Sequence, residues 1–183
     1  KFTLILETVF ASSSIDGLAE PIRETLKIAL EMRQDLKPSH CCISAAGPVS
    51  NNRCVMTNLP WSIDGDALTA AFGIPTLVVN DFVAISYGIP TLDIDDPTQI
   101  YKLAHTDGSI PTPKAATKAV IGPGTGMGVS FLAFDGERYI PASSEGGHMT
   151  FAPFDEDTVS FCEYIKKQRG CQPGVEPLVS GMG

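Results

Sequence analysis

Residues 76–82 read Thr-Leu-Val-Val-Asn-Asp-Phe, an apolar stretch that runs straight into an amide and a carboxylate. The four residues 76–79 have the length and apolar character of a buried strand, and a helix is expected to follow over residues 82–87. Polar side chains at the carboxyl end of a buried strand are where α/β proteins bind their ligands. Asn80 and Asp81 are therefore the first candidate site residues.

Asn80 and Asp81 allow two interpretations. An aspartate in this place can accept a proton from a substrate hydroxyl, and an asparagine can hold a neighbouring hydroxyl. Both residue types are also favoured as the cap of a helix, so either one can simply start the helix that follows the strand. The residues alone leave catalysis and capping at equal weight.

Strand-like and helix-like segments alternate on the N-terminal side of this stretch. Leu18, Ile22, Leu26 and Leu30 recur at helical spacing, which predicts one long helix. The expected elements are a strand at 2–9, this helix at 18–33, a strand at 41–46, a strand at 53–57 beside it, and a helix that Ser62 or Asp64 caps and that ends at Phe72, before Gly73.

The C-terminal side contains hairpin signals, of which Asp135-Gly136 between two apolar stretches is the clearest. The expected elements are a surface loop at 105–118, a strand at 119–122, hairpin strands at 129–134 and 138–141, and a helix at 158–168 with Asp155 as its cap and Gly170 at its end. Hairpins combined with helix-linked strands predict an α/β fold. A domain boundary is expected near residue 91, which gives domains 1–91 and 92–183.

A glycine-rich segment, Gly-Pro-Gly-Thr-Gly-Met-Gly at 122–128, lies between two expected strands. Glycines let the backbone approach a ligand closely, and successive N–H groups can cradle phosphate oxygens. A dinucleotide fingerprint would need a helix directly after the glycines, and a strand follows here instead. The segment therefore predicts either a phosphate loop or a plain glycine-rich turn.

Two further segments carry polar side chains near glycines. Ser-Glu-Gly-Gly-His at 144–148 places Glu145 and His148 in one tight loop, where both can bond to hydroxyl groups of a single ligand. The other interpretation is a loop histidine that is merely solvated. Glu176, in Gly-Val-Glu-Pro at 174–177, is either a further ligand or a surface residue before a helix.

Composition excludes several classes of protein. The 183 residues carry a net charge of −8 with a pI of about 4.7, whereas duplex-binding domains present a basic face. No apolar run is long enough to span a bilayer, and the N-terminal residues lack the pattern of a signal peptide. The five cysteines are odd in number and none are spaced as C-x-x-C, which indicates reduced thiols in a cytoplasmic protein. We therefore expect no nucleic-acid partner, no membrane segment and no metal held by the protein alone.

Six segments, in this order, resemble the bacterial glucokinase family, which belongs to the actin-like (ribonuclease H-like) superfamily of two-lobed, hexokinase-type sugar kinases. They read Ala-Gly-Pro-Val at 46–49, Met-Thr-Asn-Leu-Pro-Trp at 56–61, Val-Asn-Asp-Phe-Val-Ala-Ile-Ser at 79–86, Gly-Pro-Gly-Thr-Gly-Met-Gly at 122–128, Glu-Gly-Gly-His-Met-Thr-Phe-Ala-Pro at 145–153 and Glu-Pro-Leu-Val-Ser-Gly at 176–181. Each motif alone is unspecific, and their shared order carries the resemblance over essentially the whole chain.

The resemblance implies transfer of the ATP γ-phosphate to the 6-hydroxyl of D-glucose, which gives glucose 6-phosphate and ADP. It implies that Asp81 is the catalytic base and that Asn80 binds a ring hydroxyl. Glu145, His148 and Glu176 match the family's remaining sugar-binding positions. The polar chemistry agrees, since a sugar offers only hydroxyls for recognition.

The resemblance also implies how the nucleotide is bound. Gly122, Gly124, Thr125 and Gly126 match the family's second phosphate loop, beside the phosphates of ATP. Mg²⁺ would arrive bound to the nucleotide rather than in a protein cage. Proteins of this family often form dimers, so the resemblance allows a homodimer, but the sequence does not determine the oligomeric state.

The chain departs from the family pattern at both ends. It begins after the family's Asp-x-Gly-Gly-Thr phosphate loop and stops before the C-terminal Gly-Gly segment that contacts the nucleoside. We therefore expect the two-lobed α/β fold to be incomplete at both ends, and these 183 residues alone to be inactive.

Three alternatives compete with a glucokinase. The related repressor/kinase group of sugar kinases carries a cysteine-rich zinc motif after its Glu-Gly/Leu-Gly-His loop, but here only Cys162 and Cys171 follow, wrongly spaced. A non-catalytic sugar-binding or regulatory protein on a kinase-like frame would not need a base at Asp81. In a purely structural α/β domain, the glycine loops would only be turns.

Overall fold

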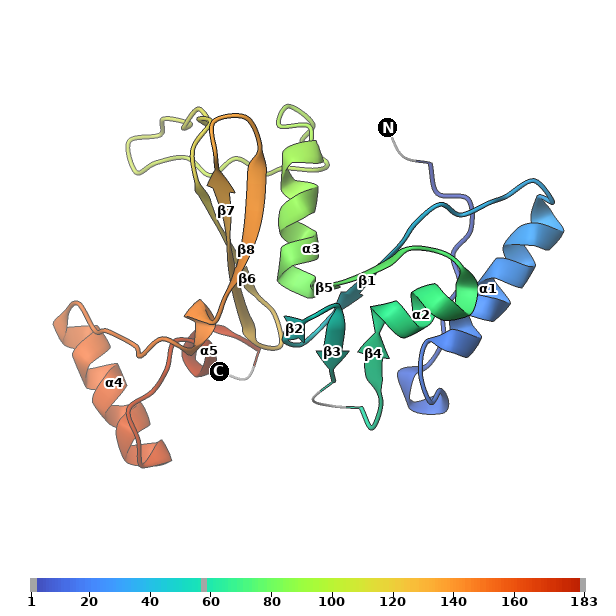
Figure 1. Ribbon diagram of the computed structural model, residues 1–183. Helices are drawn as coiled ribbons and strands as arrows, with labels where there is room; N and C mark the ends of the chain where they lie inside the picture. The colour runs from blue at the N-terminus through green and yellow to red at the C-terminus, as the bar shows by residue number, and fades with distance from the viewer. Residues whose placement is uncertain (1–2, 57–58, 182–183) are drawn as a thin grey trace. The chain divides into compact units, whose positions relative to one another are not determined.

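The computed structural model describes residues 3–56 and 59–181 (Figure 1). The chain divides into two compact units, Lys1–Asp81 and Phe82–Gly183. This division falls at the start of a helix, whereas the boundary that the sequence suggested near residue 91 falls after it. The domains 1–91 and 92–183 therefore stay a prediction.

The first unit contains a parallel strand pair and a small antiparallel sheet. Strands β1 (Cys41–Ala45) and β5 (Thr76–Asn80) pair in parallel, with Ala45 opposite Asn80 at their carboxyl ends. Strands β2 (Val49–Ser50), β3 (Arg53–Val55) and β4 (Ser62–Asp64) form the antiparallel sheet in the order β2-β3-β4. The unit also contains the 3-10 helix η1 (Ser12–Ser14) and the helices α1 (Ala19–Met32) and α2 (Gly65–Phe72).

The core of the first unit is small and apolar. Its buried members come one each from β1, β3, β4, α2 and β5 and are Ala45, Cys54, Ile63, Leu68 and Val78. Leu18 and Ile22 of the α1 region pack against this cluster from one side of the helix, as the helical spacing of the apolar residues predicted. Asp64 caps α2 by accepting from the N–H groups of Asp66 and Ala67, and Gly73 ends the helix with φ +65°.

Asn52 braces the edge of β5 that faces away from β1. It lies in the turn between β2 and β3 with φ +58°, a conformation that asparagine tolerates better than most residues. Its Nδ2 donates to the Thr76 carbonyl at 3.0 Å, and its Oδ1 accepts from the Val78 N–H at 2.8 Å. A single side-chain amide thus takes the place of a neighbouring strand along this edge.

Two expectations about the first unit are wrong. Residues 3–9 form no strand, although a strand was expected at 2–9, because no neighbouring strand pairs with them in the described part of the chain; residue 2 lies outside the described residues. Residues 53–55 form β3 as expected, but β3 pairs with β2 and β4 rather than with the strand at 41–45. Thr57, the expected end of that strand, also lies outside the described residues.

The second unit is built around the antiparallel sheet β6-β7-β8, formed by Lys118–Pro123, Met127–Phe134 and Tyr139–Ser144. Helix α3 (Asp81–Gly88) runs along this sheet (Figure 1), and the buried hydroxyls of Ser86 and Ser130 join it to β7 at 2.6 Å. The remaining elements are the 3-10 helices η2 (Ile89–Thr91) and η3 (Gly146–His148) and the helices α4 (Glu156–Arg169) and α5 (Glu176–Val179). The expected hairpin and the expected loop at 105–118 are both present.

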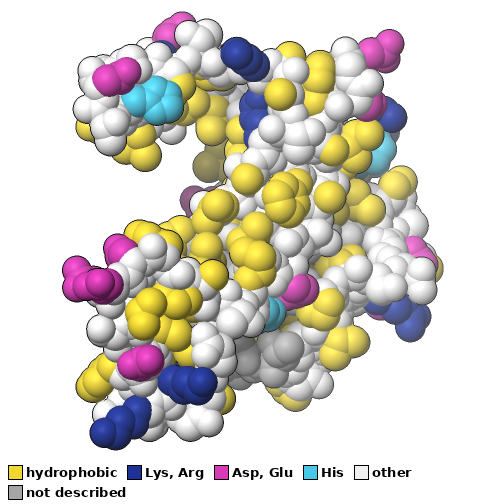
Figure 2. All heavy atoms as spheres, turned by 90° about the vertical axis from the view of Figure 1, so that its left-hand side faces the viewer, with side chains coloured by type: hydrophobic (Ala, Val, Ile, Leu, Met, Phe, Trp, Pro, Cys, Tyr) yellow, Lys and Arg dark blue, Asp and Glu magenta, His cyan; other side chains and the backbone are white. Residues whose placement is uncertain are grey.

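Helix α4 is capped at both ends. Asp155 and Thr158 form a capping box at its start, and Gly170 ends it with φ +73°. Several large apolar side chains on or next to it are exposed, among them Phe154, Phe161 and Tyr164. In Figure 2, which faces the side where α4 lies, apolar side chains reach the surface among charged ones. Helix α4 thus combines capped ends with a largely exposed apolar surface, and Cys162 is its buried residue.

The bracing by Asn52 predicts a specific loss of stability. Asn52→Gly keeps the positive φ accessible but removes three side-chain hydrogen bonds, to Thr76, Val78 and Asp66. We expect the free energy of unfolding to fall by about 2–3 kcal/mol, measured by urea denaturation. The matched control is Asn51→Gly, which also has a positive φ but an exposed side chain, and it should change stability by less than about 0.5 kcal/mol. Equal losses in both variants would contradict the bracing.

The cap of α2 predicts a dependence of stability on pH. The Ala67 N–H, together with Arg53 and the Asp66 N–H, lowers the pKa of the Asp64 carboxyl below its usual value of 3.8. A carboxyl whose pKa is lower in the folded state stabilises the fold above pH 4 and loses that contribution as the pH falls through the folded pKa. Wild type should therefore be more stable than Asp64→Asn near pH 6, and this gap should close below pH 4 in urea melts. A gap that stays constant down to pH 2 would be evidence against this.

Candidate functional site

Asn80 and Asp81 lie together at the carboxyl end of β5, as the sequence predicted. The Asn80 side-chain amide donates to the carbonyl of Gly47, just beyond the end of β1, at 3.1 Å. Asp81 is the first residue of α3, where the positive end of the helix dipole favours a carboxylate. The first unit thus presents an amide and a carboxylate side by side, at the edge where parallel strands end.

Cys54 lies near this carboxylate. Its side chain is fully buried, and burial raises the pKa of the thiol, with the negative charge of Asp81 raising it further. At neutral pH the thiol therefore stays protonated, and Cys54 adds no second negative charge beside Asp81.

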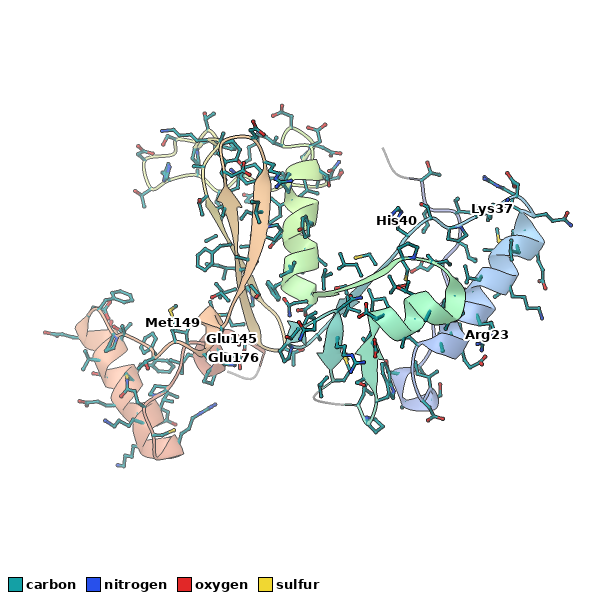
Figure 3. All side chains as sticks on the ribbon, in the orientation of Figure 1. Arg23, Lys37, His40, Glu145, Met149 and Glu176 are labelled. Carbon is teal, nitrogen blue, oxygen red and sulfur yellow. The ribbon has the colours of Figure 1, made fainter. Side chains whose placement is uncertain are left out.

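In the second unit, His148 lies between two carboxylates. Its Nδ1 is 3.0 Å from Glu145 Oε2, and its Nε2 is 3.8 Å from Glu176 Oε1. Glu145 and His148 are mostly exposed, whereas only 20% of the Glu176 side chain is exposed. Figure 3 shows Glu145 and Glu176 close to each other although they are far apart in the sequence. The structure therefore brings together three of the predicted sugar-binding residues.

Glu176 also holds the glycine loop. Its Oε2 accepts from the backbone N–H of Met127 at 2.8 Å, directly after that loop. A Cβ on Gly126 would lie 2.7 Å from the same oxygen, and a Cβ on Gly147 would overlap the Met127 carbonyl. The glycines at 126 and 147 are thus required for the close approach of three segments: the glycine loop, the loop of Glu145 and His148, and helix α5.

The glycine loop itself connects β6 to β7 through residues 124–126. The Gly124 N–H donates to the Gly126 carbonyl at 2.8 Å, and the Gly124 carbonyl accepts from the Gly181 N–H at 2.7 Å. In the part of the chain that the structure describes, the N–H groups of Thr125 and Gly126 meet no protein acceptor. The loop can therefore offer two adjacent backbone donors to an anion.

Gly122 and Gly128 have a different neighbour. They lie opposite each other across β6 and β7, and the Phe82 ring covers both. A Cβ on Gly122 would lie 2.7 Å from the ring, and a Cβ on Gly128 would overlap it. The resemblance predicts Gly122 in the phosphate loop and gives no role to Phe82. The signal that was available is a pair of glycines facing each other across a hairpin, which leaves a gap for an aromatic ring.

Comparison of the chain with known proteins identifies one family. The family model described as Glucokinase matches residues 4–183. The chain belongs to the glucokinase family. This confirms the resemblance on which the sequence interpretation rested.

Individual relatives agree with the family match. A glucokinase of Nostoc punctiforme is 38% identical over 150 residues, which are 80% of this chain and 41% of that protein. The bifunctional protein glk of Paraburkholderia xenovorans is 37% identical over 160 residues, which are 87% of this chain and 24% of that protein. The crystal structure of a glucokinase from an Antarctic psychrotroph matches with a TM-score of 0.76 and 28% identity, and covers 94% of this chain and 50% of that one.

These matches confirm a mixed α/β fold of the glucokinase type. The chain spans less than half the length of the curated glucokinases it matches. Among residues 3–56 and 59–181, no helix is both long enough and apolar enough to cross a membrane.

The contact between Glu176 and Met127 predicts a local change in dynamics. Glu176→Ala removes the acceptor of the Met127 N–H, so this amide should exchange with solvent about 10- to 100-fold faster, as expected for a hydrogen bond to a charged group. The measurement is hydrogen exchange followed by NMR. Glu145→Ala is the matched control, because Glu145 contacts His148 and not the Met127 amide, and exchange at Met127 should stay unchanged. Unaltered exchange in Glu176→Ala would show that the loop is held by other contacts.

Proposed function

We propose that the protein transfers the γ-phosphate of ATP to the 6-hydroxyl of D-glucose, on a two-lobed, actin-like (ribonuclease H-like) frame in the cytoplasm. The observation that carries this proposal is the cluster of Glu145, His148 and Glu176, with Glu176 joined to the glycine loop through Met127. Glu176 thus joins the side chains proposed to bind hydroxyls to the loop whose backbone N–H groups are proposed to bind an anion. Membership in the glucokinase family supports this assignment.

The three side chains suit a sugar. A hexose presents only hydroxyls, each of which donates one hydrogen bond and accepts others. Glu145 and Glu176 supply acceptors, and His148 supplies either a donor or an acceptor. Carboxylates that bond a hydroxyl also discriminate against a sugar in which that hydroxyl is missing or points elsewhere, because the carboxylate is then left unpaired.

Asp81 is proposed as the base and Asn80 as the ligand of a neighbouring ring hydroxyl. A hydroxyl is a weak nucleophile, and phosphoryl transfer depends mainly on alignment and on stabilising charge. Asp81 would orient the 6-hydroxyl toward the phosphorus and take up its proton. The protonated neighbour Cys54 adds no negative charge beside Asp81.

The glycine loop fits the phosphates of ATP. Thr125 and Gly126 offer adjacent N–H groups in the described structure, and Gly124 shapes the turn that presents them. Backbone donors suit a protein with a net charge of −8, because they bind an anion without a basic patch. Mg²⁺ would come with the nucleotide, and its charge would offset that of the phosphates.

The proposal predicts the effect of removing the base. Asp81→Asn should lower kcat by about 10²- to 10⁴-fold, the usual contribution of a general base, with little change in the KM for glucose. The measurement is glucose-dependent ADP release by the full-length protein in a coupled assay. The control is Asp16→Asn, an exposed residue outside the site, which should retain the wild-type rate.

The same assay, combined with a measurement of glucose binding, distinguishes a kinase from a non-catalytic sugar-binding protein. If glucose binds, and His148→Ala weakens that binding, while wild type releases no ADP, the protein is a binder and the proposed activity is wrong. If phosphoryl transfer persists at the wild-type rate in Asp81→Asn, the kinase is retained but Asp81 is not its base.

A further inference from the structure

Phe82, the residue directly after Asp81, is anchored on the sheet of the second unit. Its ring occupies the gap that Gly122 and Gly128 leave on neighbouring strands. The two glycines are register partners, so the gap spans both strands at one level of the hairpin. Any side chain on Gly128 would overlap the ring, and one on Gly122 would approach it to 2.7 Å.

The backbone of Phe82 is held as well. Ser86 Oγ donates to the Phe82 carbonyl at 2.7 Å, and this uses the only proton of that hydroxyl. Ser130 Oγ of β7 lies 2.6 Å from Ser86 Oγ and 3.5 Å from the same Phe82 carbonyl, so its proton can be donated to either oxygen. Both serine side chains are fully buried, so these bonds are not exposed to competition from water.

We infer that Phe82 is a positioning residue for Asp81. Its ring in the glycine gap and its carbonyl in the serine pair fix the first turn of α3 on β6 and β7, and Asp81 begins that turn. This inference rests on the proposed function, in which Asp81 is the base. It divides the glycine segment in two: Gly122 and Gly128 serve the Phe82 ring, whereas residues 124–126 face the phosphates.

The two roles of a glycine predict different kinetics. Disturbing a phosphate loop weakens ATP binding and raises the KM for ATP. Disturbing the placement of a base lowers kcat and leaves substrate binding nearly unchanged. Gly128 lies in the glycine-rich segment but contacts the ring, so the effect of a methyl group at this position distinguishes the two.

The experiment is a double-mutant cycle on the full-length protein, with kcat and the KM for glucose and ATP measured for Gly128→Ala, Phe82→Leu and the combination. Gly128→Ala should lower kcat at least tenfold, with both KM values within about twofold of wild type. Leucine lacks Cε2 and Cζ, the two ring atoms that the new methyl group would overlap most, so Phe82→Leu in the Gly128→Ala background should recover part of the lost kcat. Gly88 lies at the end of α3, and among the described residues no contact within 4 Å is found for a Cβ at this position, so Gly88→Ala should change none of these values.

Several results would overturn the inference. A raised KM for ATP with kcat retained would make Gly128 part of the phosphate loop. If Gly128→Ala lowers kcat by the same factor with leucine as with phenylalanine at position 82, the two positions are not coupled. A lower melting temperature with an unchanged kcat per folded molecule would make the contact purely structural. If Gly128→Ala fails to fold, Gly122→Ala, whose overlap with the ring is smaller, takes its place in the cycle.

The cycle also separates this inference from the proposed function. Activity in wild type that is lost in Asp81→Asn, without coupling between positions 82 and 128, would overturn only the role of Phe82. An inactive wild type would remove the proposed function, and the role assigned to Phe82 with it.

Discussion

The carboxylate of Glu176 is the contact on which the second unit's candidate site depends. One oxygen accepts from the Met127 N–H after the glycine loop, and the other faces His148. The segments it joins are separate in the sequence, and Gly126 and Gly147 remove the side chains that would keep them apart. A charge-assisted hydrogen bond is stronger than a neutral one, so a single side chain can hold a turn that is otherwise secured by the Gly124 carbonyl and the Gly181 N–H.

The first unit uses the same device. The Asn52 amide satisfies the Thr76 carbonyl and the Val78 N–H along one edge of β5, while β1 pairs with the other edge. An unpaired strand edge would need water or another chain. Asn80 repeats the pattern on a smaller scale, because its side chain ties the end of β5 to Gly47. In both units, then, side-chain amides and carboxylates bond to backbone groups that no neighbouring strand pairs, and two of these side chains, Asn80 and Glu176, are candidate site residues.

Local sequence signals predicted most of the elements but not their partners. The spacing of Leu18 and Ile22 predicted α1, and the caps at Asp64 and Asp155 predicted the starts of α2 and α4, because helix periodicity and capping are properties of neighbouring residues. The pairing of β3 and the absence of a strand at 3–9 could not be predicted this way, because a ladder depends on which distant strand is available. The candidate site divides likewise. Glu145 and His148 share one short loop, whereas the contact of Phe82 with Gly128 joins residues that no local pattern connects.

The position of Glu176 raises an electrostatic problem that the structure itself answers. In the proposed function, a carboxylate that binds sugar lies against a loop that binds phosphates, and two negative groups at this separation repel each other. The repulsion is reduced when the carboxylate oxygens accept hydrogen bonds from protein donors. The Met127 N–H takes one oxygen, and the His148 ring faces the other. The same ring faces Glu145 through Nδ1 at 3.0 Å, so in its neutral form its single N–H is directed to one of the two carboxylates. In the proposed function, the donors to the phosphates are backbone N–H groups, which can bind an anion without a basic patch even in a protein with a net charge of −8.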